Sequence, residues 1–151
     1  MDLTFVDTGA FIALADKPDS LNARAEGIYA RLIAARAALI TTNHVVDETC
    51  SWLLRHTREG HKAALAFGEA VAGAISVVAP DHLRLSATPS RLVVIYSSPS
   101  IERAAWDIFA RYDTAGFSFT DCVSFAVMQA LDIKKAFSFD DHFDVMGFER
   151  L

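Results

Sequence analysis

Short apolar runs alternate with longer stretches of helical periodicity along the whole chain. The apolar runs have the length and β-branched content of strands buried in a sheet, and they span residues 2–6, 38–42, 75–79, 91–97 and 136–139. The stretches between them show apolar residues at helical spacing, and they span residues 8–16, 21–38, 43–56, 59–74, 100–112 and 121–131. This alternation predicts an α/β sandwich with a central, mainly parallel sheet flanked by helices.

Polar residues stand where the N-caps of three of these helices are expected. Asn43, Ser100 and Thr120 each precede a helical pattern, and such side chains accept hydrogen bonds from the free N–H groups of a first helical turn. Residues 80–89 follow neither period, so no element is predicted there.

Acidic residues stand near the predicted carboxyl ends of strands. Asp7 follows the first strand and Asp140 follows the last, while Glu48 and Asp121 lie near the starts of two helices. In an open parallel sheet, the carboxyl ends of the strands share one edge, and ligands bind there. We therefore expect these four carboxylates, distant in sequence, to converge at that edge.

Such a cluster needs cations or protons to persist. Two carboxylates ~5 Å apart repel by about 3 kcal/mol at an effective dielectric constant of ~20. Oxygen ligands suit a hard ion such as Mg²⁺ or Mn²⁺. A site of this kind is typical of phosphodiester hydrolysis, in which one or two ions orient a water and stabilise the leaving oxygen.

Each acid also has a simpler interpretation. Asp121 suits the positive end of a helix dipole, and Asp140 begins the acidic turn DDHFD. Asp47 and Glu48 flank the apolar face of their helix on opposite edges, so helical spacing does not choose between them. That face is expected to consist of Val45, Val46, Cys50, Trp52, Leu53 and Leu54.

Composition bounds the class of protein. The 151 residues suit one domain over residues 1–151. No apolar run approaches the ~20 residues of a membrane span, and no basic leader precedes an apolar segment, so we expect a cytoplasmic protein without a membrane anchor. The net charge of −5 argues against a broad basic surface for nucleic acid, whereas 52% hydrophobic residues suit an oligomer interface.

Other catalytic classes fit the motifs poorly. Asp7-Thr8-Gly9 is the aspartic-protease tripeptide, but that reaction needs two such loops sharing a proton on an all-β scaffold. A phosphatase of the haloacid-dehalogenase type would need a second Asp where Gly9 stands. Among other side chains, Trp52, Trp106 and Phe109 could stack on bases, although core or dimer contacts are commoner. His142 could ligate a metal, although a structural contact is commoner.

Four blocks in order resemble the PIN domain family, and within it the VapC-type toxins of toxin–antitoxin pairs. The blocks are FVDTGAFIALAD, TTNHVVDETCSWL, FSFTDCVSFAVM and AFSFDDHFDVMGFERL, and each contains one acid of the family pattern. In the second block the acid of the pattern falls on Glu48, and in the fourth on Asp140. The resemblance covers nearly the whole chain.

The resemblance implies a ribonuclease dependent on Mg²⁺ or Mn²⁺. Asp7, Glu48, Asp121 and Asp140 would then bind metal directly or through water. Thr8 and either Ser118 or Thr120 become candidates for orienting a carboxylate or the scissile phosphate, with helix capping as the simpler role of Thr120. The resemblance also implies RNA as substrate, a homodimer, and inhibition by a cognate antitoxin.

Two features keep alternatives open. The segment 79–98 is longer than the usual family connection, so an extra hairpin there could alter the dimer contacts. The same resemblance is also compatible with a housekeeping ribonuclease in RNA processing or with a non-catalytic binding module, although a module without catalysis has no physical need for four mutually repelling carboxylates.

Overall fold

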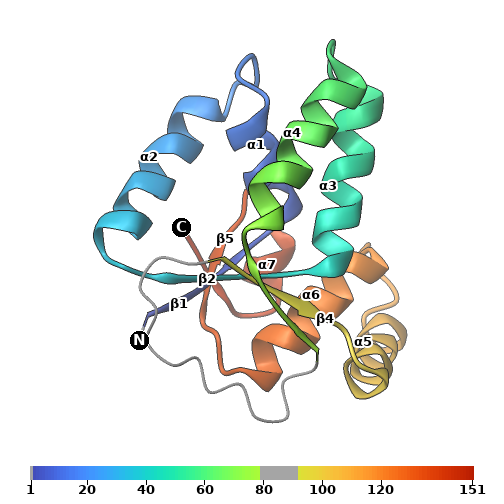
Figure 1. The fold of residues 1–151 in the computed structure, drawn as a ribbon. Coiled ribbons are helices and arrows are strands. Elements are labelled where there is room, and N and C mark those ends of the chain that lie inside the picture. Colours follow the sequence, from blue (N-terminus) through green and yellow to red (C-terminus); the bar gives the residue numbers. More distant parts are fainter. Residues whose placement is uncertain (1, 79–91) are drawn as a thin grey trace.

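The computed structural model describes residues 2–78 and 92–151 (Figure 1). Their six strands form one sheet in the order β3-β4-β2-β1-β5-β6, and every neighbouring pair is parallel. The strands are β1 (Leu3–Val6), β2 (Ala38–Thr42), β3 (Ile75–Val78), β4 (Leu92–Tyr96), β5 (Lys135–Phe137) and β6 (Glu149–Arg150). The first strand of the chain therefore lies inside the sheet, between β2 and β5.

Helices cover both faces of this sheet, as Figure 1 shows. They are α1 (Thr8–Ala15), α2 (Asn22–Ala34), α3 (Asn43–His56), α4 (Gly60–Ala72), α5 (Pro99–Arg111), α6 (Phe119–Ala130) and α7 (His142–Val145). The sequence therefore predicted the α/β/α sandwich correctly, and the described sheet is parallel throughout.

Alternation along the strands divides the core into two parts. Successive side chains of a strand point to opposite faces, so Phe5 packs with α5 and α6, whereas Val6 packs with α1 and α2. Leu39 and Ile40 of β2 divide in the same way. A third cluster joins α3 to α4 through Leu53 and Phe67. Packing on both faces thus holds β1 rigidly at the centre of the sheet.

The predicted N-caps are wrong by one or two residues. At the three true caps the backbone is extended, and the side-chain oxygen accepts a hydrogen bond from the N–H three residues later. These caps are Thr42, Ser98 and Ser118, whose partners are Val45, Ile101 and Asp121. Each predicted cap, by contrast, lies inside the first turn of its helix.

Other boundaries also differ from the prediction. Helix α2 ends at Ala34 rather than at residue 38, and α7 and β6 have no counterpart in the sequence pattern. Asp140 does not end a strand directly, because β5 stops at Phe137 and Asp140 lies in the following loop. The unusual connection at 79–98 falls largely outside the described residues, and its last part forms β4.

The apolar face predicted for α3 is shifted around the helix. The buried positions are Val45, Thr49 and Leu53, whereas Leu54 is 49% exposed. Thr49 is buried because its hydroxyl donates a hydrogen bond to the carbonyl oxygen of Val45 at 2.8 Å, which satisfies the polar group inside the core.

Phe125 is predicted to be a principal contributor to stability. It is fully buried on α6, and its ring contacts those of Phe117, Phe143 and Phe148 at centroid distances of 5.0, 5.1 and 5.9 Å. We expect Phe125→Ala to lower the free energy of unfolding by about 3–5 kcal/mol in urea titrations. Leu65→Ala, at an exposed position of α4, is the control and should change it by less than about 0.5 kcal/mol.

Candidate metal centre

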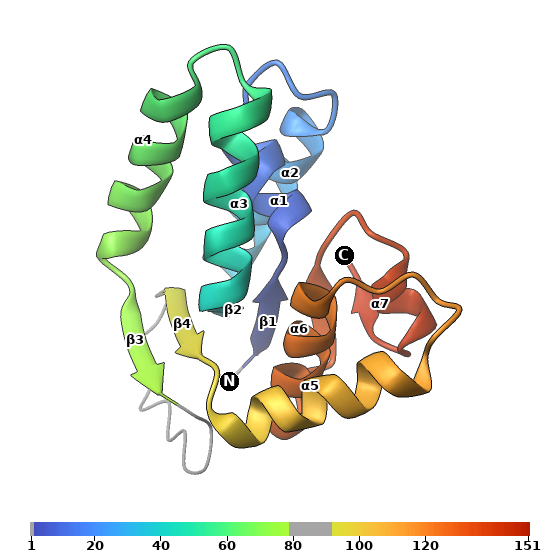
Figure 2. The ribbon, with the colours of Figure 1, turned by 90° about the vertical axis from the view of Figure 1, so that its right-hand side faces the viewer.

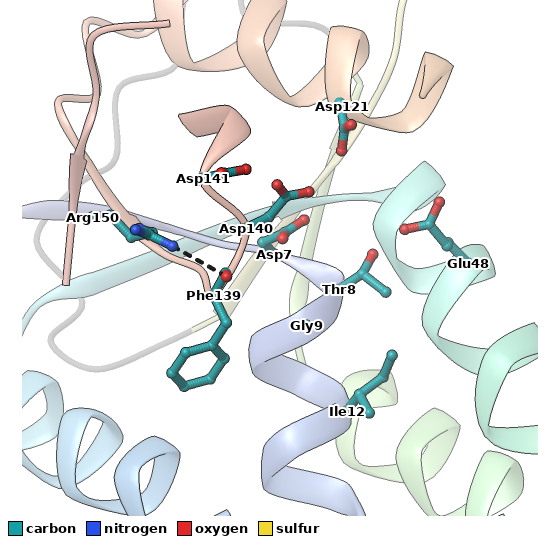
Figure 3. Close-up of a pocket in the computed structure, with 10 residues that line it drawn as sticks. All are labelled: Asp7, Thr8, Gly9, Ile12, Glu48, Asp121, Phe139, Asp140, Asp141 and Arg150. Atoms are coloured by element: carbon teal, nitrogen blue, oxygen red, sulfur yellow. Dashed lines mark hydrogen bonds between the residues drawn. The ribbon is translucent and has the colours of Figure 1, made fainter. Parts of the chain in front are cut away.

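The four acids predicted from the sequence meet at the carboxyl edge of the sheet. Figure 2 shows β1 ending between α3 and α6, and a cavity of about 710 Å³ opens there. Asp7, Glu48, Asp121 and Asp140 all line this cavity, each from a different segment of the chain (Figure 3). The tertiary structure thus brings together carboxylates that are up to 133 residues apart in sequence, from Asp7 to Asp140.

Asp7 is the most deeply buried of the four. It precedes α1 directly, is 5% exposed, and its backbone N–H donates to the carbonyl oxygen of Phe137 on β5 at 3.1 Å. The Ser138 hydroxyl donates to its carboxylate at 2.9 Å. The pKa of Asp7 is raised to about 7, chiefly by burial and in smaller part by the Asp121 and Asp140 carboxylates, against the opposing hydrogen bonds from Ser138 and the Thr8 backbone.

Asp121 is positioned by the first turn of α6. Its backbone N–H donates to the Ser118 hydroxyl at 3.0 Å, and its carboxylate accepts a hydrogen bond from the Ser118 N–H at 2.9 Å. This reciprocal pair is a capping box. Ser118 therefore orients the Asp121 carboxylate through its backbone, while its hydroxyl caps the helix.

A histidine links Asp121 to Asp140. Nδ1 of His142 lies 3.2 Å from a carboxylate oxygen of Asp121 and 3.3 Å from one of Asp140. The His142 backbone N–H donates to the other Asp140 oxygen at 3.0 Å, and Ser138 accepts from the Asp140 N–H at 3.0 Å. Ser138 and His142 thus tie three of the four acids into one network.

The neighbouring acids Asp47 and Glu48 point into different spaces. Glu48 lines the acidic cavity, whereas Asp47 lines a second cavity of about 470 Å³ between α3, α4 and the adjoining strands. The burial of Val45, Thr49 and Leu53 sets this rotation of α3. The structure therefore settles an assignment that helical spacing left open.

The candidate orienting residues differ in whether they line the cavity. Thr8 is buried, lines the cavity, and its hydroxyl has no hydrogen-bond partner among the described residues. Thr120 lies in the first turn of α6, where its carbonyl oxygen accepts from the Ser124 hydroxyl. Ser138 was not singled out from the sequence, although it is the Ser that precedes Asp140 in the fourth family block.

Cys122, beside Asp121, is unsuited to be a nucleophile. Burial, with a smaller contribution from the Asp121 charge, raises the pKa of its thiol to about 11. Its thiol therefore stays protonated near neutral pH.

The donor set fits a hard divalent cation. One oxygen each of Asp121 and Asp140 and a ring nitrogen of His142 lie within 4.8 Å of one another, and Asp7 and Glu48 line the same cavity. Burial, and to a smaller extent the Asp121 and Asp140 carboxylates, raises the pKa of Asp7, and a bound cation would favour its charged form instead. Carboxylate oxygens are ligands that Mg²⁺ and Mn²⁺ accept.

A parallel sheet whose carboxyl edge gathers four acids in this order is the architecture of a PIN domain nuclease. The PIN domain family model matches residues 4–149, and the chain belongs to this family. The aspartic-protease interpretation fails, because Asp7-Thr8-Gly9 leads from a parallel strand into a helix rather than between antiparallel strands.

Several known proteins are similar to this chain over nearly its whole length. The "23S rRNA-specific endonuclease VapC20" of Mycobacterium tuberculosis is 32% identical over 146 residues, which cover 97% of this chain and 95% of the relative. The "VapC ribonuclease" of Archaeoglobus fulgidus is 27% identical over 142 residues, covering 93% and 78%. The crystal structure of M. tuberculosis VapC20, described as a "Sarcin-Ricin loop cleaving toxin", superposes with a TM-score of 0.74 at 33% identity and covers 97% of this chain and 96% of its own.

Asp7 is predicted to make the metal-free protein less stable as the pH rises. The ordinary pKa of Asp7 is 3.8, and its pKa in the folded protein is about 7. Between pH 3.8 and about pH 7, the folded protein therefore keeps a proton on Asp7 that the unfolded chain has lost. The stability that this proton contributes to the folded state is fully present below pH 3.8 and is lost as the pH rises through about 7.

Urea titrations in EDTA test this expectation. The free energy of unfolding of the wild type, relative to that of Asp7→Asn, should fall by up to about 4 kcal/mol between about pH 4 and pH 8. If the difference in free energy of unfolding between the wild type and Asp7→Asn does not change with pH, the pKa of Asp7 is not raised in the folded protein.

Proposed function

We propose that this chain is a metal-dependent endoribonuclease that hydrolyses RNA phosphodiester bonds, with residues 1–151 as a single nuclease domain. The observation that carries the proposal is the convergence of Asp7, Glu48, Asp121 and Asp140 in one cavity. The names of the relatives, which are endonucleases and ribonucleases, support it. A binding module without catalytic activity would not need to hold four mutually repelling carboxylates together.

The four acids are the proposed holders of Mg²⁺ or Mn²⁺, directly or through water. When bound, the ion supplies a water of lowered pKa and neutralises charge on the leaving oxygen. Ser138 holds Asp7, the Ser118 N–H holds Asp121, and His142 spans Asp121 and Asp140. These hydrogen bonds fix the carboxylates before substrate arrives, which lowers the cost of assembling the site.

Thr8 is the proposed substrate-orienting residue. The residue lines the cavity, and its hydroxyl is buried without a hydrogen-bond partner among the described residues. A buried hydroxyl of this kind is costly unless a ligand or water satisfies it, so a phosphate oxygen is a suitable partner. Ser118 and Thr120, at the start of α6 beside Asp121, are further candidates, although they are not among the described residues that line the cavity.

The wider role proposed is that of a toxin. The relatives are named VapC, and one structure is described as a toxin that cleaves the sarcin–ricin loop. We therefore propose a cytoplasmic enzyme, restrained by a cognate antitoxin, with the sarcin–ricin loop of 23S rRNA as the first substrate to test. None of the described helices is long and apolar enough to cross a membrane.

Cleavage assays with two neighbouring variants test the nuclease. An RNA hairpin that carries the sarcin–ricin loop should be cut with Mg²⁺ or Mn²⁺ and left intact in EDTA. Glu48→Gln should lower kcat/KM by on the order of 100-fold because a charged metal-site oxygen is removed. Asp47→Asn, on the adjacent residue that faces the other cavity, should stay within about twofold of the wild type. Equal effects of the two variants contradict the site.

We also propose that the chain forms a homodimer through the exposed aromatic face of α5. Trp106 is 55% and Phe109 43% exposed, and Trp106 stacks on Phe119 of α6 at 4.3 Å. Exposed aromatic clusters of this size favour association. Arg103 and Asp107 are exposed one turn apart on the same helix, so a two-fold axis crossing α5 between them brings each Arg103 beside the other copy's Asp107.

Trp106→Glu is predicted to convert the dimer to a monomer, because it places a charge in the apolar centre of the interface. Light scattering coupled to size-exclusion chromatography measures the mass. Leu65→Glu, at an equally exposed position on α4, is the control and should leave the dimer intact. A monomeric wild type at micromolar concentration rules out the interface.

A further inference from the structure

One end of the acidic cavity is lined by an arginine. Among the described residues that line the cavity, Arg150 is the one cationic side chain. Figure 3 shows Arg150 and Glu48 on opposite sides of Asp7 and Asp140. In a chain of net charge −5, a polyanion that enters this cavity meets a cation in its lining at the Arg150 end.

Arg150 is held in place but keeps free hydrogen-bonding capacity. One Nη donates to the carbonyl oxygen of Phe139 at 3.1 Å, and the other lies 2.8 Å from a carboxylate oxygen of Asp144. A guanidinium has five N–H donors, so donors remain for a ligand, and the side chain is 32% exposed. Because two interactions already restrain it, little side-chain entropy remains to be lost on binding.

Phe139 lines this end of the cavity, and Arg24 lies beside its ring. Phe139 directly precedes Asp140, lines the cavity and is partly exposed. In Figure 3 its ring extends away from the carboxylates towards α2. The guanidinium carbon of Arg24, an exposed residue of α2, lies 5.4 Å from the centre of this ring. Two arginines from different elements therefore contact Phe139, Arg24 at its ring and Arg150 at its backbone carbonyl.

We propose that Arg24, Phe139 and Arg150 form a binding subsite for the nucleotide next to the scissile phosphate. The arginines contact a backbone phosphate of single-stranded RNA, and the Phe139 ring provides a surface for its base. Arginine matches phosphate geometry and aromatic rings stack on any base, so the subsite binds backbone and base without requiring a particular sequence. This inference rests on the proposed ribonuclease function.

A purely structural role for Arg150 makes different predictions. In that case Arg150 only ties β6 to the loop after β5 and to α7, through the Phe139 carbonyl and Asp144. Its replacement would then disturb Asp140 and lower kcat. Arg24 would have no effect on catalysis, because it approaches the ring from a separate helix.

The experiment measures kcat and KM for the sarcin–ricin hairpin with Mg²⁺ or Mn²⁺ over a series of KCl concentrations. Arg24→Gln and Arg150→Gln should each raise KM by roughly 10- to 100-fold, as expected when a charge-assisted hydrogen bond to phosphate is removed, with kcat nearly unchanged. The slope of log kcat/KM against log salt should flatten by about 0.7 for each phosphate that the variant no longer neutralises. Phe139→Leu, which keeps apolar bulk, should raise KM without flattening the slope.

Arg31→Gln is the matched control. Arg31 is also exposed on α2, seven residues or ~10 Å further along the helix than Arg24, and this variant should match the wild type. If the wild type cuts RNA but Arg24→Gln and Arg150→Gln behave like Arg31→Gln, the subsite is wrong. A fall in kcat at constant KM also overturns it and assigns Arg150 the structural role. A wild type without cleavage activity refutes the ribonuclease function instead.

Discussion

The burial of one carboxylate beside other carboxylates at one edge of the sheet is the constraint on which the rest of the structure depends. Asp7 is almost completely buried beside Asp121 and Asp140, and its pKa is raised to about 7. A site that stores this much unfavourable energy relaxes unless its backbone is held from several directions. The two-sided packing of β1 and its pairing with β2 and β5 supply that restraint.

Hydrogen bonds from neighbouring side chains then orient the carboxylates at this rigid edge of the sheet. Ser138 contacts both Asp7 and Asp140, while His142 contacts Asp140 and Asp121. The capping box of α6 serves stability and chemistry together, because the same carboxylate that completes the cap faces the cavity. The first turns of α1 and α6 are therefore parts of the site rather than only its supports.

Much of this arrangement could be predicted because it depends on local patterns. Strand and helix periods identified the layers, and the strand ends placed Asp7 and Asp140 near one edge. The errors also have local causes. Thr42, Ser98 and Ser118 compete with nearby polar residues for the cap, and only the backbone conformation decides among them. The role of Ser138 could not be predicted because a single serine in a short loop has no periodic signature.

The sequence by itself determined the α/β class, the parallel sheet and the set of acids that could meet, since each follows from spacing along the chain. Helical spacing left open which acid of the Asp47–Glu48 pair faces the cavity, and the tertiary structure puts Glu48 there, as the family pattern had indicated. That choice depends on the rotation of α3, which packing of Val45 and Leu53 against other elements sets. It also placed Arg24 against Phe139, 115 residues later in the chain, because contacts between distant segments leave no trace in local periodicity.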